Sequence, residues 1–207
     1  MKKLFTTLFI CTIYIILLSS CSSNHSKDVY FIHASAIARE NDEISLYCVA
    51  QKLGKKDEEK YFVASSKGKN TKDAIEKMSR KYSECYFATN EIFILPEDMD
   101  ISFLKDISHI CENPFVPSTS RVLLAKNEDL LLFAEKVKNE DDLKKLLKKT
   151  EKNKVGFIHF LACCLSDNKG IKVEIIQEDD NGNLSASRHK TFHGTDFSKY
   201  SKKENNK

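Results

Sequence analysis

The chain has 207 residues, with 33 Lys and Arg against 30 Asp and Glu, and it contains no tryptophan. Two of its three net positive charges are Lys2 and Lys3, so the rest of the chain is close to neutral. This balance argues against a nucleic-acid-binding protein, which usually carries a marked basic excess, and the length suits one domain with its own core.

The N-terminal segment has the layout of a bacterial secretory signal. Lys2 and Lys3 precede an uncharged run over residues 4–18, and small residues follow it. The alternative is a permanent transmembrane helix, which needs about 20 apolar residues. The run of 15 residues is too short for that, so a secretory signal is favoured.

The end of this segment, "LSSC" at residues 18–21, resembles the lipobox of bacterial lipoproteins. The resemblance implies cleavage before Cys21 and a diacylglyceryl group on its thiol. We therefore predict a lipoprotein signal peptide at residues 1–20, a lipid-attachment site at Cys21, and a small polar tether at residues 21–27.

Three strand-like segments follow the tether. Residues 28–38 and 61–68 are apolar runs with β-branched and aromatic residues, and residues 43–53 partly alternate in polarity. Turn-forming and charged residues separate the three segments. This order predicts an antiparallel meander.

The pattern then changes to the helical period. Asn70 can cap a helix, with the Asp73 carboxylate reaching back toward the cap. One face would hold Ala74, Ile75, Met78 and Tyr82.

A strand is predicted over residues 85–95, ended by Pro96, and Asp100 is expected to cap the next helix. The apolar face of that helix would hold Ile101, Leu104, Ile107 and Cys111. Residues 119–127 form another strand-like run.

The C-terminal part mixes helices with a late strand. Helices are expected to begin at residues 127–129 and 139–142, where acidic residues suit the helix dipole. The apolar segment 154–167 is interpreted as a buried helix, with a strand as the alternative. A strand at residues 171–179, a turn at "NGN" and a polar tail at residues 198–207 complete the pattern.

Together these elements predict an α+β fold with a mixed β-sheet that begins as an antiparallel meander and is flanked by helices. The domain is expected to span residues 28–197.

No local catalytic motif stands out: a Gly-rich phosphate loop and a G-x-S-x-G elbow are both missing from the sequence. His189 and His193 have a spacing that could ligate a metal on a helix, but the segment "SASRHKTFHGTD" (185–196) favours a surface loop. His33 and His159 are interpreted as core histidines, with a Cys–His dyad as a less favoured alternative. We expect no catalytic residue, metal or cofactor.

Five cysteines remain after the signal and the lipid site: Cys48, Cys85, Cys111, Cys163 and Cys164. Their odd number excludes complete intramolecular pairing, and four of them lie in three apolar runs. We therefore expect five core thiols rather than a disulfide framework.

These segments together resemble the N-terminal domain of the Ger(x)C, or GerAC-type, spore germination lipoproteins. The residues that carry the resemblance are the lipobox, the hairpin segment 31–51 ending in Gln51, the segment 63–99 with Glu97, and the strand and helix at 120–131. This family provides the C subunits of nutrient germinant receptors in endospore-forming Firmicutes.

The resemblance implies a membrane-anchored receptor component on the outer face of the cytoplasmic, spore inner, membrane. Polytopic receptor subunits would be its partners, and it would act by protein–protein contacts in germination, with no enzymatic activity and no nucleic-acid partner.

The chain also departs from the family pattern. Ser22 and Ser23 replace a Trp-Asp pair, and Ala34 and Ala36 replace glycines. A usual C subunit has two further domains, so we expect a divergent member with the first domain only. An envelope ligand-binding lipoprotein or small hydrolase unrelated to sporulation stays open as the alternative.

Overall fold

A computed structural model describes residues 29–52, 60–82, 84–112, 116–137, 139–149, 155–166, 170–179, 182 and 184–193. The predicted signal peptide, the lipid site Cys21, the tether and the polar tail lie outside these residues.

The described residues form one mixed sheet of eight strands, in the order β3-β2-β1-β5-β6-β7-β8, with β4 beside β1. Its strands are β1 (Val29–Glu40), β2 (Glu43–Lys52), β3 (Lys60–Gly68), β4 (Glu84–Tyr86), β5 (Ile92–Pro96), β6 (Arg121–Ala125), β7 (Ile171–Glu178) and β8 (Leu184–Phe192). The predicted meander is confirmed, because β1, β2 and β3 pair antiparallel. The central strands β1, β5, β6 and β7 run parallel, and β8 returns antiparallel to β7.

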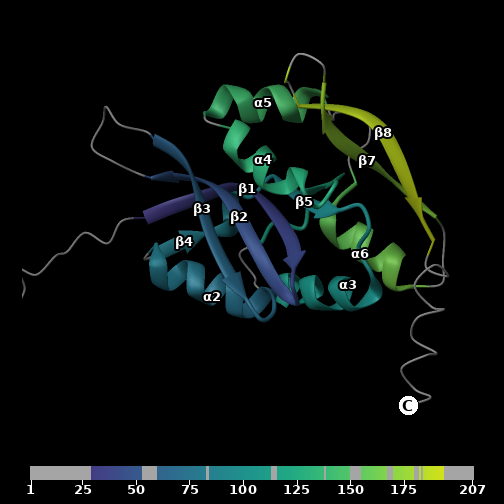
Figure 1. The fold of residues 1–207 in the computed structure, drawn as a ribbon, viewed down its shortest axis with the longest axis horizontal. Coiled ribbons are helices and arrows are strands. Elements are labelled where there is room, and N and C mark those ends of the chain that lie inside the picture. Colours follow the sequence, from purple (N-terminus) through teal and green to yellow (C-terminus); the bar gives the residue numbers. More distant parts are fainter. Residues whose placement is uncertain are drawn as a thin grey trace, which may run out of the picture.

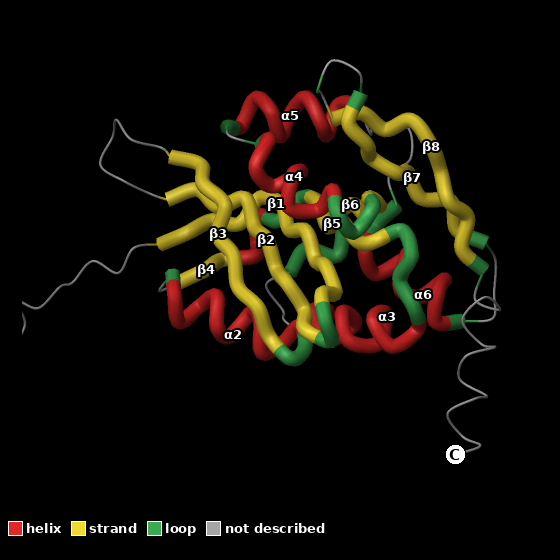
Figure 2. Tube along the Cα trace, in the orientation of Figure 1, coloured by secondary structure: helices red, strands yellow, loops and turns green. Residues whose placement is uncertain are grey.

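Helices cover both faces of the sheet, which confirms the predicted α+β class (Figures 1 and 2). They are α2 (Thr71–Lys81), α3 (Ile101–Ser108), α4 (Asp129–Lys136), α5 (Glu140–Lys149) and α6 (Phe157–Leu165). Side chains of α2, α3 and α6 belong to one core cluster and those of α4 and α5 to the other. The sheet therefore separates two hydrophobic cores.

The first hairpin turns at Asn41 and Asp42, which both have positive φ (48° and 65°). Two such residues form the tight turn that matches the twist of paired strands, and Asn and Asp tolerate this conformation well. As a result β1 continues to Glu40, two residues beyond the predicted end of the strand.

The passage from β3 into α2 depends on Gly68 and on a helix cap. A Cβ atom on Gly68 would lie 2.3 Å from the backbone nitrogen of Ala74, so only glycine fits here. Asn70 Oδ1 accepts a hydrogen bond from the Asp73 N–H at 2.8 Å, and the Asp73 carboxylate accepts one from the Lys69 N–H at 2.9 Å. The predicted cap and back-reaching carboxylate are both confirmed.

The predicted strand 85–95 is wrong as a single element. β4 pairs with Val29–Phe31 of β1, and β5 pairs with Ala34–Ala36, with a 3₁₀ turn at Phe87–Thr89 between them. Phe87 turns into the core, and Thr89 Oγ1 donates to the Ile32 carbonyl. The break lies beside a shift in the pairing register of β1, between Ile32 and Ala34.

The predicted apolar face of the second helix is partly wrong. Asp100 caps α3 as expected, accepting from the Phe103 N–H at 2.7 Å, and Leu104 and Ile107 are buried. The α-helix ends at Ser108 and a 3₁₀ turn follows, with three residues per turn. That change in period exposes Cys111 and buries Ile110 instead.

In the C-terminal part the predicted helices α4 and α5 and the predicted strand β7 are confirmed, and two segments remain to be compared. The segment 154–167 contains a helix, α6, so the strand alternative is wrong there. The predicted surface loop at 185–196 is also wrong, because β8 forms the edge of the sheet as far as Phe192, which is buried. An edge strand with one solvent-facing side carries a weak apolar pattern, which explains the error.

Candidate functional site

The predicted alternative of a His189–His193 metal site does not form. His189 lies on β8, where residues four apart are separated by roughly 13 Å along the strand. His189 instead faces Glu174, with Nε2 3.8 Å from Oε1. Among the described residues, no group of three or more His, Cys, Asp or Glu side chains could hold a metal ion.

The two histidines interpreted as core residues, His33 and His159, differ from each other in burial. His33 is half-buried on β1 and its Nε2 lies 2.8 Å from Gln51 Oε1, as a satisfied histidine should. His159 is exposed on α6, so its interpretation as a core histidine is wrong. Its Nε2 lies 3.8 Å from Cys163 Sγ, one turn further along the same helix.

All five remaining cysteines are free thiols, but only Cys48 and Cys164 are buried, so the expectation of five core thiols is too broad. Burial raises the pKa of the Cys48 thiol to about 12 and that of Cys85 to about 11. Since the thiolate is the nucleophilic form, burial disfavours nucleophilic reactions of these two thiols at neutral pH.

A buried polar network joins β1 to the start of β5 and β6. Ser35 Oγ donates to Asn90 Oδ1 at 2.9 Å, and Asn90 Nδ2 donates to the Ile92 carbonyl at 3.2 Å. Ser120 Oγ contacts the carbonyls of Asn90 and Pro117, at 2.6 and 2.8 Å. The network satisfies polar groups that would otherwise be costly to bury, and it fixes the three strands relative to one another.

Next to this network lies a polar cavity of about 440 Å³, at the end of the sheet where β5 and β6 begin. His33, Glu91 and Arg121 contribute its titratable side chains. Arg121 Nη1 also donates to the Leu147 carbonyl on α5 at 2.8 Å, so the guanidinium is held in place. The cavity offers polar groups and space for a small polar ligand, as the alternative function requires.

Glu174 is another buried polar residue, and the sequence analysis did not identify it. Its side chain is 6% exposed, and Oε2 has no hydrogen-bond partner. Burial raises the pKa of this carboxyl, while His189 and Arg121 oppose that shift. The residues next to Glu174 in the sequence do not indicate that its side chain is buried, because its partner His189 lies on another strand.

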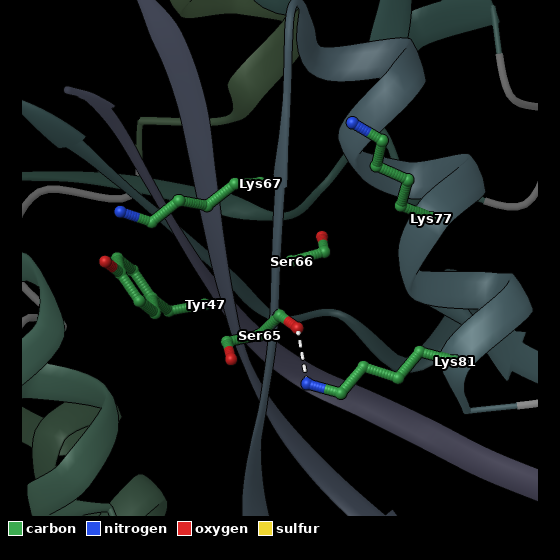
Figure 3. Close-up of a pocket in the computed structure, with 6 residues that line it drawn as sticks. All are labelled: Tyr47, Ser65, Ser66, Lys67, Lys77 and Lys81. Atoms are coloured by element: carbon green, nitrogen blue, oxygen red, sulfur yellow. Dashed lines mark hydrogen bonds between the residues drawn. The ribbon is translucent and has the colours of Figure 1, made fainter. Parts of the chain in front are cut away.

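A lysine-lined groove of about 370 Å³ runs along the edge strand β3. Figure 3 shows Tyr47 and Lys67 on one side of this strand, and Lys77 and Lys81 reaching toward it from α2. Lys81 Nζ donates to the Ser65 carbonyl at 3.4 Å, and the Ser65 N–H donates to the Tyr82 hydroxyl at 3.4 Å. Both outward backbone groups of Ser65 are therefore capped by side chains, a common protection of sheet edges.

Carboxylates balance part of the charge in this groove. Lys67 Nζ lies 2.6 Å from Glu40 Oε2, and Lys77 Nζ lies 2.9 Å from Asp73 Oδ2. The Lys67 ammonium lowers the pKa of Glu40, and Lys77 and the Lys69 N–H lower that of Asp73. An acidic or hydrogen-bonding protein segment could exchange with these surface pairs, because pairs of this kind are individually weak.

The described residues include no helix that is long and apolar enough to cross a membrane. A family model described as the spore germination protein N-terminal domain matches residues 22–159. No curated protein and no solved structure matches the chain. Since the family match covers well over half of the sequence, the chain belongs to the spore germination protein N-terminal domain family and has a role in spore germination.

Proposed function

We propose that the protein is a lipid-anchored component of a spore nutrient germinant receptor, and that it acts through protein–protein contacts rather than catalysis. The observation that carries the proposal is the family match, which begins at residue 22, directly after the predicted lipid site Cys21. A lipid on Cys21 would hold the domain at the outer face of the spore inner membrane, beside polytopic receptor subunits. Two or more acyl chains give stable anchoring.

The lysine-lined groove supports this proposal as a contact surface. It offers ammonium groups from Lys67, Lys77 and Lys81 together with serine hydroxyls, along a strand at the open edge of the sheet. An acidic segment of a receptor subunit has the complementary charge and hydrogen-bonding groups.

The test is deletion of the gene in the native spore former, followed by complementation. We expect the deletion to abolish germination on at least one nutrient of a panel, and the wild-type gene to restore it and to co-purify a polytopic membrane protein. Cys21→Ala should leave an unlipidated protein that does not restore germination. Lys77→Ala combined with Lys81→Ala should weaken the co-purification.

The matched control is Lys105→Ala combined with Lys148→Ala, which removes two exposed lysines from α3 and α5. It should behave as wild type. Normal germination of the deletion strain on every nutrient, with no co-purified polytopic protein, would contradict the receptor proposal. That result would favour the ligand-binding alternative, with the polar cavity beside Arg121 as its site.

A further inference from the structure

The aromatic side chains of the described residues divide sharply by burial. Of the aromatic side chains that the structure describes, Tyr47 and seven phenylalanines are buried, none of them more than 8% exposed. Within the same described ranges, the aromatic side chains that are not buried lie at one end of the sheet, which we call the aromatic end: Tyr30, Phe31, Tyr61, Phe62, Tyr82 and Tyr86. Phe62 and Tyr82 pack against one hydrophobic core and Tyr61 against the other, whereas Tyr30, Phe31 and Tyr86 belong to neither core.

Strand pairing brings these six residues together. Phe31 pairs with Gln51 of β2, which pairs in turn with Tyr61 of β3, and Tyr86 of β4 lies on the other side of Phe31. The rings of Phe31 and Tyr86 stack with centroids 5.9 Å apart. Tyr86 is 40% exposed, so the stacked pair reaches the surface.

A second group of rings continues the aromatic end toward α2. Tyr30 lies edge-on to Phe62, with centroids 5.4 Å apart, and Tyr82 lies 5.8 Å from Phe62. The last turn of α2 carries the basic residues Arg80 and Lys81, and the Lys81 ammonium sits 4.9 Å from the centroid of the Tyr82 ring. Aromatic rings are therefore bordered by cations.

The aromatic end is also where the described chain begins. The start of β1 lies at one end of the longest axis of the molecule, and α6, β7 and β8 lie at the other (Figure 1). Seven residues separate Cys21 from Val29, and they can span at most about 27 Å. A lipid on Cys21 thus keeps this end of the domain close to the bilayer.

We propose that the aromatic end rests on the headgroup region of the membrane that Cys21 anchors the chain to. The inference rests on the lipid anchor of the proposed function. Tyrosine rings favour the membrane–water interface, where an apolar body and a polar tip are both accommodated, and phenylalanine rings can bury at the boundary with the acyl chains. Exposed Arg and Lys beside them suit anionic lipid headgroups. The long axis of the domain would then rise away from the membrane.

The lack of tryptophan in the sequence makes this contact measurable, because one introduced tryptophan reports only on its own surroundings. Tyr86→Trp places the probe in the aromatic end. Leu165→Trp on α6 is the matched control, since Leu165 is 45% exposed and lies at the opposite end of the molecule. The full lipidated chain is reconstituted in protein-free vesicles of phosphatidylethanolamine and phosphatidylglycerol, with or without bromine on the acyl chains.

We expect bromine on the acyl chains to quench the emission of the Tyr86→Trp protein, as for an interfacial aromatic residue, and to leave the emission of the Leu165→Trp protein unchanged. Phe31→Trp is a second probe of the same surface, and circular dichroism verifies the fold of each variant. If the chain floats with the vesicles but neither Tyr86→Trp nor Phe31→Trp is quenched, the membrane contact is refuted while the anchor stands. A protein partner would then occupy this surface. Failure to float would refute the anchor and the membrane contact together.

Discussion

At the scale of single residues, the most constrained polar groups hold the sheet together. Ser120 is 1% exposed, and its hydroxyl lies within hydrogen-bond distance of two carbonyls, those of Asn90 and Pro117. Asn90 is as buried as Ser120 and links the same region to Ser35 of β1. Losing one member of such a network leaves a buried acceptor unsatisfied, which costs more than the net value of the bond.

We predict that Ser120→Ala lowers the free energy of unfolding by about 1–3 kcal/mol. The control is Ser108→Ala, which also removes a hydroxyl that donates to the carbonyl three residues earlier, at Lys105, but near the surface. The control should cost less than about 0.5 kcal/mol, because water can replace the lost bond. Urea unfolding of both variants measures the difference, and equal losses would show that burial of Ser120 is not the cause.

At the scale of helices and strands, the sequence was most informative where a local rule determines the structure. The caps at Asn70 and Asp100 and the hairpin turn at Asn41 use side chains that act within three residues of their own position. The break between β4 and β5 depends on their pairing with β1, which is distant in the sequence, so the local pattern did not predict it. β8 pairs with the preceding strand β7, but as an edge strand it carries a weak apolar pattern, and it was predicted as a loop.

The same distinction applies to the candidate surfaces. The three lysines of the groove and the six rings of the aromatic end come from separate strands and from α2, and no short motif contains them. The family resemblance was visible in the sequence, because it depends on the order of segments. The burial of Glu174 and the arrangement of the polar cavity needed the folded sheet.

The cap of α3 gives a prediction for pH. Burial tends to raise the pKa of Asp100, but hydrogen bonds from the Phe103 N–H and from Ser102, with the charge of Arg39, lower it on balance. A carboxyl with a lowered pKa in the folded state stabilises the protein above its unfolded pKa of about 3.9, and this contribution is lost as the pH falls through the folded value.

We therefore predict that Asp100→Ala costs about 1 kcal/mol at pH 7, and that its difference from the wild type shrinks in acid. Asp100→Asn keeps an acceptor for the Phe103 N–H without the charge, so it should cost less at neutral pH and show a weaker pH dependence. The midpoints of urea unfolding at pH 7 and in acid provide the measurement. A loss from Asp100→Ala that is as large in acid as at neutral pH would mean that the carboxylate form is not what stabilises the helix.

At the scale of the whole molecule, the structural unit extends beyond the residues that match the family. The match ends at residue 159, inside α6, yet β7 joins the sheet beside β6 and β8 completes it. Side chains from β7 and β8 enter both hydrophobic cores, and the ring of Phe192 packs edge-on against Phe160 at 5.6 Å. The two strands are thus part of the same folding unit as the matched residues.

We predict that a chain ending after Ser166 does not fold, whereas a chain ending after His193 unfolds cooperatively like the full chain. The shorter chain loses five buried apolar side chains, Ile171, Val173, Ile175, Ile176 and Phe192. Burying each contributes about 1.5–3 kcal/mol, so their sum is comparable to the total stability of a typical domain, about 5–15 kcal/mol. The shorter chain also exposes the apolar edge of β6, which favours aggregation. The measurements are the solubility and the urea unfolding of the two truncated chains. If the chain that ends after Ser166 is soluble and unfolds cooperatively, the domain is complete without β7 and β8, and the prediction is wrong.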